Sequence, residues 1–143
     1  QPQQQHMKDL CAMYNCEEVQ MQADGNCQFR ALSFRLYGSE DRHAEVRANI
    51  MQHLRENPER YSAFVETDEV FADFVNRMSQ DGEWGGHRTL RAFEQSYRRG
   101  VLVLNDNEQN PILDPAFEDS SEDPITVTHY GEVHYNGTRP IHA

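Results

Sequence analysis

One cysteine stands where a loop is expected to turn into a helix, a position that suits a nucleophile. Residues 24–32 read Asp-Gly-Asn-Cys-Gln-Phe-Arg-Ala-Leu, so Cys27 follows a glycine that permits a tight turn and Asn26 that can cap the helix. In the first helical turn a thiolate faces unpaired backbone N–H groups and the positive end of the helix dipole, which lower a thiol pKa. The pattern predicts that Cys27 opens a helix and is a reactive nucleophile.

A histidine near the other end of the chain can serve as the base for that thiol. His134 is followed two residues later by an amide, Asn136, in the segment His-Tyr-Asn. A histidine can accept the thiol proton, and an amide can hold the ring in one tautomer. We therefore expect Cys27, His134 and Asn136 to form a catalytic triad.

Each of these residues also has an ordinary structural interpretation. Cys27 could be a small buried hydrophobe, and His134 could be a strand histidine with a structural hydrogen bond. Asn136 and Gly137 together are typical of a tight hairpin turn. His129 is the competing base, but the residue two positions beyond it is a glycine, which has no side chain to orient a ring.

Length and composition fit a single folded domain. The chain has 143 residues, of which 37% are hydrophobic and 10% aromatic, too many for a disordered chain. We expect one domain over residues 1–143, with residues 1–8 as a polar N-terminal segment. Because the sequence starts on Gln1 rather than Met, we expect the domain to be cut from a longer protein.

The charge of the chain excludes some partners and favours others. A formal net charge of −11 argues against binding to nucleic acid, whose phosphates need a basic surface, and favours a basic protein or peptide segment. No run approaches the roughly 18 apolar residues of a membrane span, and the first residues do not form a signal peptide. We expect a monomer that binds neither nucleic acid nor membrane.

The other two cysteines indicate a compartment rather than a site. Three cysteines without a signal peptide suit a reducing compartment, either cytoplasm or nucleus, or the host cytosol if the protein is a secreted effector. The spacing of Cys11 and Cys16 is poor for zinc, since no second pair of ligands follows. We interpret both as ordinary small residues on a short helix or loop, and we expect no metal and no cofactor.

Helices are expected in the first two thirds of the chain. Apolar residues recur there at helical spacing between capping and breaking residues. The pattern predicts a helix from Cys27 that stops at Gly38, a second that begins after Ser39 and is broken at Asn57, and a short third from Pro58 that buries Tyr61 and Phe64. A fourth helix, capped by Thr67, carries Val70, Phe71, Phe74, Val75 and Met78 and ends near Gly82. A fifth carries Leu90, Phe93 and Tyr97 and stops at Gly100.

Strands are expected in the last third. The apolar run 101–104 predicts a buried central strand, residues 111–113 a short edge strand, and residues 114–124 an exposed loop. Residues 125–128 and 133–135 alternate as strands do. A nucleophile on an early helix would then meet a base on a late strand across a cleft between a helical layer and a sheet, as in papain-like proteases.

Several motifs in order resemble the ovarian-tumour (OTU) family of cysteine deubiquitinases. They are Asp24-Gly25-Asn26-Cys27 with Phe29-Arg30-Ala31 after it, His43-Ala44-Glu45-Val46-Arg47, Glu83-Trp84-Gly85-Gly86-His87 and His134-Tyr135-Asn136. The resemblance covers about residues 20–140. It implies an α+β fold of the papain-like OTU type, with a small central β-sheet between helical layers.

The resemblance also implies an activity and a role for each site residue. It implies hydrolysis of the isopeptide or peptide bond after the C-terminal Gly-Gly of ubiquitin or of polyubiquitin chains, with ubiquitin-like modifiers as further candidates. Cys27 would be the nucleophile, His134 the general base and Asn136 the third member. The loop that begins at Asp24 would supply backbone N–H groups to an oxyanion hole.

The sequence departs from the family pattern at two positions, and one loop keeps two interpretations. Gln28 stands where many members have leucine, which we expect to matter little, and Asn136 stands where other members have Asp. Gly85 and Gly86 would let a peptide approach closely, so they and Trp84 are candidate substrate-binding residues; the alternative is that Trp84 anchors the core. Two other functions remain open: a catalytically silent ubiquitin-binding module and a hydrolase of small amides or thioesters.

Overall fold

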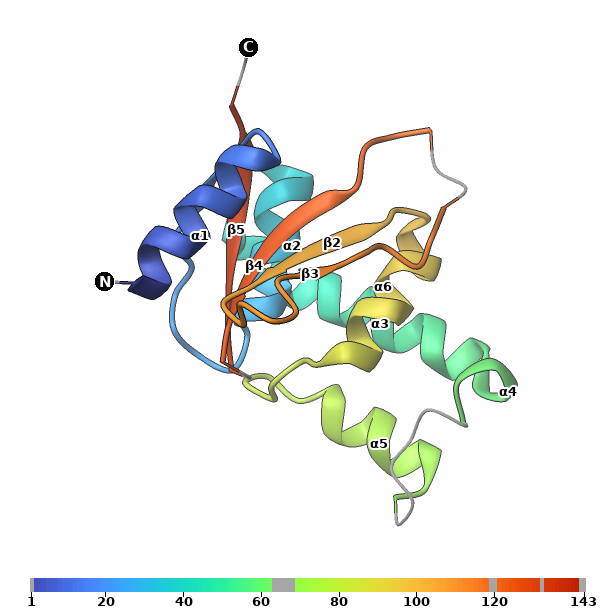
Figure 1. Ribbon diagram of the computed structural model, residues 1–143. Coiled ribbons are helices and arrows are strands. Elements are labelled where there is room, and N and C mark those ends of the chain that lie inside the picture. The colour runs from blue at the N-terminus through green and yellow to red at the C-terminus, as the bar shows by residue number, and fades with distance from the viewer. Residues whose placement is uncertain (1, 63–68, 119–120, 132, 142–143) are drawn as a thin grey trace.

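A five-stranded sheet with helices on both faces organises the chain, which a computed structural model describes over residues 2–62, 69–118, 121–131 and 133–141 (Figure 1). The strand order is β1-β5-β4-β2-β3; β2 and β4 are parallel, and the other neighbours are antiparallel. The elements in chain order are α1 (Pro2–Met13), β1 (Cys16–Val19), α2 (Cys27–Tyr37), a 3-10 turn (Glu40–Arg42), α3 (His43–Glu56), α4 (Pro58–Tyr61), α5 (Phe71–Met78), α6 (His87–Tyr97), β2 (Val101–Asn105), β3 (Ile112–Leu113), β4 (Ile125–Tyr130) and β5 (His134–Pro140).

Each face of the sheet has its own apolar cluster, and β2 shows why. Its side chains alternate between the faces, so Val101 and Val103 join the large cluster with α2, α3, α5 and α6, whereas Leu102 and Leu104 pack with α1. Figure 1 shows α1 on one side of the sheet and α2, α3 and α6 on the other. The predicted α+β fold, a small sheet between helical layers, is confirmed.

The helix opened by Cys27 is confirmed, and the helices after it are shorter than predicted. Gly38 ends α2 in the left-handed conformation at φ 77°, which glycine adopts without strain. Between Ser39 and α3 lies the separate 3-10 turn. α5 begins at Phe71 and ends at Met78, so Val70 lies outside it and is 65% exposed. Tyr61 is buried as predicted, whereas Phe64 and Thr67 lie outside the described residues.

The N-terminal prediction was wrong. The segment 1–8 was expected to be a polar extension, but the helix α1 starts at Pro2, and Met7, Leu10 and Cys11 are buried on the sheet. Leu10 and Cys11 come three and four residues after Met7, so a single helix face carries all three. Cys16 then begins a strand, β1, rather than lying on a helix or loop.

The hairpin interpretation of Asn136 and Gly137 was also wrong. Both residues lie inside β5, which pairs with β4 on one side and β1 on the other. The turn between β4 and β5 falls instead near Gly131, whose φ is 61°. A Cβ on Gly137 would lie 3.2 Å from carbon atoms of Met21 and Phe34, so glycine permits close packing here rather than a turn.

The described part of the chain, 2–62, 69–118, 121–131 and 133–141, contains no helix with the length and apolarity needed to cross a bilayer.

Candidate active site

The candidate nucleophile lies against an open edge of β5. β1 pairs with β5 only from Gly137 to Pro140, so on this edge the backbone at the start of β5 can form hydrogen bonds with groups outside the sheet. There the backbone N–H of Tyr135 donates to the Cys27 sulfur at 3.3 Å, and the thiol donates to the carbonyl of Val133 at 3.4 Å. The two backbone contacts flank His134, so the fold places the predicted nucleophile beside the strand segment that carries the predicted base.

The His134 ring is held by Asn136. Nε2 of the ring lies 2.7 Å from Oδ1 of Asn136, and the Gln20 amide nitrogen lies farther away, at 3.4 Å. An amide oxygen only accepts hydrogen bonds, so the shorter contact requires a proton on Nε2. The other ring nitrogen, Nδ1, is then the atom that can take the proton of Cys27.

His129, the competing base, has different contacts. Its Nδ1 lies 3.1 Å from Oδ1 of Asn105, and its ring stacks on that of Tyr135 with centroids 4.1 Å apart. The structure thus joins His134, and not His129, to the amide of Asn136.

The predicted low pKa of the nucleophile was wrong. Cys27 is only 1% exposed, and burial raises the pKa of its thiol, with a further upward contribution from the Asp24 carboxylate. The hydrogen bond from the Tyr135 N–H and the amides at the helix start act in the opposite direction and are outweighed. Burial in apolar surroundings disfavours the thiolate more than the helix start favours it. Burial therefore favours the neutral thiol of Cys27 over its thiolate.

This protonation state predicts a spectroscopic result. An ordinary thiol has a pKa of about 8.5, and the pKa of Cys27 lies above its usual value, so the thiolate forms only as pH rises into the alkaline range. We expect the ultraviolet absorbance of the thiolate, taken as the difference between the wild type and Cys27→Ala, to be absent at pH 7 and to grow only above the ordinary thiol pKa of about 8.5. A thiolate signal at pH 7 would instead show a preformed thiolate–imidazolium pair.

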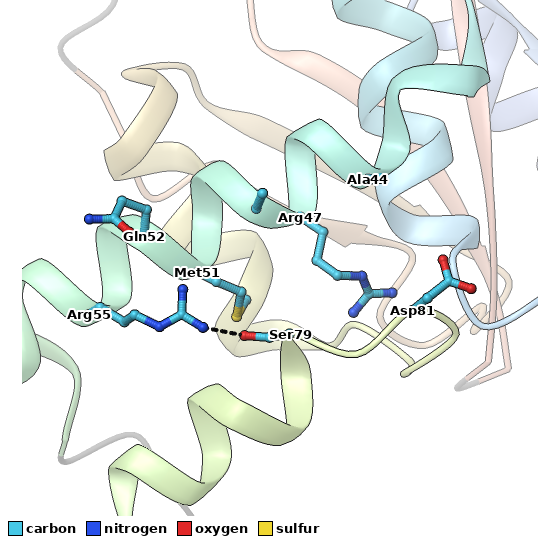
Figure 2. A pocket seen from close by; sticks show the side chains of 8 residues that line it. Ala44, Arg47, Met51, Gln52, Arg55, Ser79 and Asp81 are labelled. Atoms are coloured by element: carbon cyan, nitrogen blue, oxygen red, sulfur yellow. Dashed lines mark hydrogen bonds between the residues drawn. The ribbon is translucent and has the colours of Figure 1, made fainter.

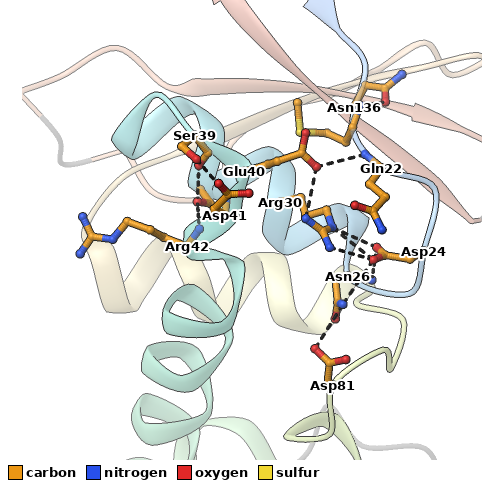
Figure 3. Close-up of polar contacts among 12 residues, drawn as sticks. Gln22, Asp24, Asn26, Arg30, Ser39, Glu40, Asp41, Arg42, Asp81 and Asn136 are labelled. Carbon is orange, nitrogen blue, oxygen red and sulfur yellow. Dashed lines mark hydrogen bonds and ion pairs between the residues drawn. The ribbon is translucent and has the colours of Figure 1, made fainter.

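Asp24 holds the turn before the nucleophile. Its carboxylate forms an ion pair with Arg30 at 2.9 Å, and this hydrogen bond lowers the pKa of Asp24 (Figure 3). The same carboxylate accepts a hydrogen bond from the N–H of Asn26 at 2.9 Å, and the backbone carbonyl of Asp24 accepts one from the N–H of Cys27 at 3.2 Å. Two amides of the predicted oxyanion loop are thus engaged at rest, so a substrate oxyanion would have to compete for them.

Asn26 occupies the N-cap position but does not cap the helix with its side chain, contrary to the prediction. Its Oδ1 accepts from Arg47 and from the N–H of Gly82, each at 2.8 Å, and its Nδ2 donates to Asp81 at 3.3 Å (Figure 3). Gly25 explains the closeness of the two segments, because a Cβ there would lie 1.6 Å from the Gly82 carbonyl oxygen. These hydrogen bonds and this close packing hold the turn before Cys27 against the turn that follows α5.

Arg47 completes this attachment from α3. Its guanidinium donates to the carbonyls of Met78 and Glu83, both at 2.8 Å, and lies over the Phe29 ring at 4.0 Å. The side chain borders a pocket between α3 and the segment after α5 (Figure 2). Burial lowers the pKa of Arg47, and its two terminal nitrogens donate to the carbonyl and amide oxygens around them. The sequence analysis noted Arg47 only as part of a family motif, although a charged residue on a buried helix face was a signal of this role.

Gln28, the residue after the nucleophile, contacts the loop that carries Trp84. Trp84 is 50% exposed, so its interpretation as a core anchor was wrong. Gln28 is 1% exposed; its amide donates to the Gly86 carbonyl at 3.1 Å and accepts from the Thr89 hydroxyl at 2.6 Å. A Cβ on Gly85 would lie 2.3 Å from the Gln28 oxygen. Gln28, expected to matter little, fixes the loop that carries the candidate substrate-binding residues.

A cysteine at a helix start, packed against a strand whose histidine is hydrogen-bonded to an amide, is the arrangement of papain-like cysteine proteases. Residues 22–138 match the family model described as OTU-like cysteine protease. The chain therefore belongs to the OTU-like cysteine protease family.

Individual relatives agree with this assignment. The chain is 37% identical over 134 residues to "OVARIAN TUMOR DOMAIN-containing deubiquitinating enzyme 10" of Arabidopsis thaliana, covering 92% of this chain but 37% of the relative. It thus spans just over a third of that relative's length. Among solved structures, the OTU domain of OTUD1 superposes with a TM-score of 0.84 at 23% identity, covering 96% of this chain and 95% of that domain. An OTU domain in complex with ubiquitin gives a TM-score of 0.73 at 16% identity, covering 86% and 69%.

Proposed function

We propose that this chain is the catalytic domain of a thiol-dependent deubiquitinase, which hydrolyses the bond after the C-terminal Gly-Gly of ubiquitin. The observation that carries the proposal is the site at the edge of β5, where the Cys27 sulfur contacts the backbone on both sides of His134 and Asn136 holds the His134 ring. Family membership and a relative named as a deubiquitinating enzyme support this substrate.

The chemistry follows from the protonation states at rest. Cys27 Sγ attacks the carbonyl carbon of the terminal glycine while its proton passes to Nδ1 of His134. The imidazolium then protonates the leaving amine, the C–N bond breaks, and a thioester forms between ubiquitin and Cys27. His134 next takes a proton from water, whose oxygen attacks the thioester, and the free carboxyl group and the thiol are released.

The surrounding residues support these steps. Asn136 keeps Nε2 protonated, so that Nδ1 stays available as the base. We assign the oxyanion to the backbone amides between Asp24 and Cys27, which requires the substrate to displace the turn bonds made there at rest. Because Cys27 is buried, the substrate carbonyl reaches the sulfur only after local movement. The exposed Trp84 and the two glycines after it are the proposed contacts of the substrate tail.

The state of the cysteines agrees with the proposed compartment. We place the enzyme in a reducing compartment, cytoplasm or nucleus, with ubiquitin or polyubiquitin as its partner. Cys11, Cys16 and Cys27 are free cysteines, and Cys11 and Cys16 form a hydrogen bond to each other rather than a disulfide. A reducing environment keeps such a pair as thiols.

A ubiquitin probe with a C-terminal electrophile tests the proposal. We expect one covalent adduct per chain, seen as the added mass of a single probe, and hydrolysis of a fluorogenic ubiquitin amide. Ubiquitin without the electrophile is the control and should add no mass. Binding of ubiquitin without adduct and without hydrolysis would reject the enzyme and leave the silent binding module. A panel of linkage-defined diubiquitins then identifies the chain type that is cleaved.

A further inference from the structure

Glu18 on β1 lies behind the third member of the triad. Its carboxylate accepts hydrogen bonds from the hydroxyls of Thr128 and Tyr130 and, at 3.1 Å, from the side-chain amide of Asn136. Burial and the bond to Glu18 raise the pKa of Tyr130, which keeps its hydroxyl as a donor. A carboxylate surrounded by three donors in this way has a fixed position.

The contacts of Asn136 leave its amide only one orientation. The Oδ1 side faces the backbone N–H of Met21 at 2.8 Å, which is a donor. The Nδ2 side faces two acceptors, the Glu18 carboxylate at 3.1 Å and the Gln20 side-chain oxygen at 3.3 Å, of which the carboxylate carries the charge. Rotating the amide by 180° would place the NH₂ against the Met21 N–H and the oxygen against the carboxylate. Because Asn136 is 2% exposed, water cannot relieve either clash.

The orientation of the amide decides the tautomer of the base. With Oδ1 toward the ring, His134 must carry its proton on Nε2, which leaves Nδ1 free to accept the thiol proton. With the amide reversed, the NH₂ would donate to Nε2 and the proton would move to Nδ1, where it blocks the base. An asparagine, unlike an aspartate, has these two faces, and so needs a neighbour that selects one of them.

We propose that Glu18 is a positioning residue that fixes the Asn136 amide, and through it the Nε2–H tautomer of His134. The proposal rests on the proposed function for its kinetic consequence, but the tautomer itself does not depend on any substrate.

A double-mutant cycle tests the route of the effect. We expect Glu18→Ala to lower kcat/KM about tenfold, mostly through kcat, because the proposed effect acts on the protonation of His134. In an Asn136→Ala background the same change should cost less than about twofold, since the group through which Glu18 acts is gone. Glu18→Gln keeps an oxygen that can accept from Asn136, and should restore kcat/KM to within about threefold of the wild type.

Glu17 provides the matched control. It is the preceding residue on β1, it carries the same charge, and its exposed side chain pairs with Arg139 at 3.2 Å. Glu17→Ala should change kcat/KM less than twofold. Unchanged kcat/KM in Glu18→Ala, an equal loss in both backgrounds, or a Glu18→Gln protein as impaired as Glu18→Ala would each overturn the proposal.

The histidine rings give a readout without substrate. In long-range ¹H–¹⁵N NMR spectra, neutral His134 should be the Nε2–H tautomer in the wild type and in Glu18→Gln, and a mixture of both tautomers in folded Glu18→Ala. An unchanged tautomer in Glu18→Ala would overturn the proposal. If the wild type fails to hydrolyse any ubiquitin substrate, the proposed function falls while this measurement still decides the role of Glu18.

Discussion

Replacing Cys27 with alanine is expected to abolish turnover and labelling by the ubiquitin probe, with kcat/KM lower by at least about a thousandfold. The sulfur is the atom that forms the thioester, and no neighbouring group can replace it. The fold should persist, because removing one buried sulfur leaves only a small cavity and costs on the order of 1 kcal/mol. Hydrolysis of a fluorogenic ubiquitin amide, with thermal unfolding measured in parallel, checks both expectations.

The other two cysteines provide matched controls. Cys11 and Cys16 are buried like Cys27, but they belong to the cluster between α1 and the sheet. Cys11→Ala and Cys16→Ala should keep hydrolysis and probe labelling while lowering the unfolding temperature slightly. Substantial hydrolysis by Cys27→Ala, or loss of labelling in either control, would show that the nucleophile is misassigned.

The elements that local signals define could be predicted from the sequence. Helix α2 has a start at Cys27 and a left-handed glycine stop at Gly38, and the apolar run 101–104 predicted a buried strand, which is confirmed. The residue types and order also predicted that Cys27, His134 and Asn136 act together; the structure joins His134 to Asn136, and the catalytic roles of the three stay a prediction. These predictions needed no knowledge of distant contacts.

Elements that depend on distant partners were missed. β1 has only four residues, and it is a strand because it pairs with β5 more than a hundred residues later. Because the strand β1 was not predicted, the sequence analysis could not place Glu18 next to Asn136. The alternation of buried Cys16, exposed Glu17 and half-buried Glu18 was the available signal, and it was too short to distinguish a strand from a loop.

Properties that arise from packing were predicted wrongly or not at all. The thiol pKa was expected to be low from the helix start alone, yet it is raised because the sulfur is buried against β5. Asn26 was expected to cap α2, but Arg47 and the Gly82 amide compete successfully for its oxygen. Both outcomes depend on which side chains the tertiary fold brings near, and a local motif does not contain that information.

The second large effect is expected at the base, and the structure ranks the two remaining triad members. His134→Ala should lower kcat/KM by at least about a thousandfold, since the ring that Asn136 holds is removed. Asn136→Ala should cost about ten- to a few hundredfold, because a free ring still samples the productive tautomer. Asn136→Ala also leaves the Met21 N–H without its acceptor, so its free energy of unfolding should fall by about 1–3 kcal/mol.

His129→Ala is the control for this ranking. The His129 ring bonds to Asn105 and stacks on Tyr135, so its loss should reduce stability and leave kcat within about threefold of the wild type. Steady-state kinetics of the three variants, at a temperature where all are folded, separate catalysis from stability. If His134→Ala kept more activity than Asn136→Ala, or if His129→Ala lost as much as His134→Ala, the base would be His129, and the hydrogen bond between His134 and Asn136 would serve only to hold β5 in place.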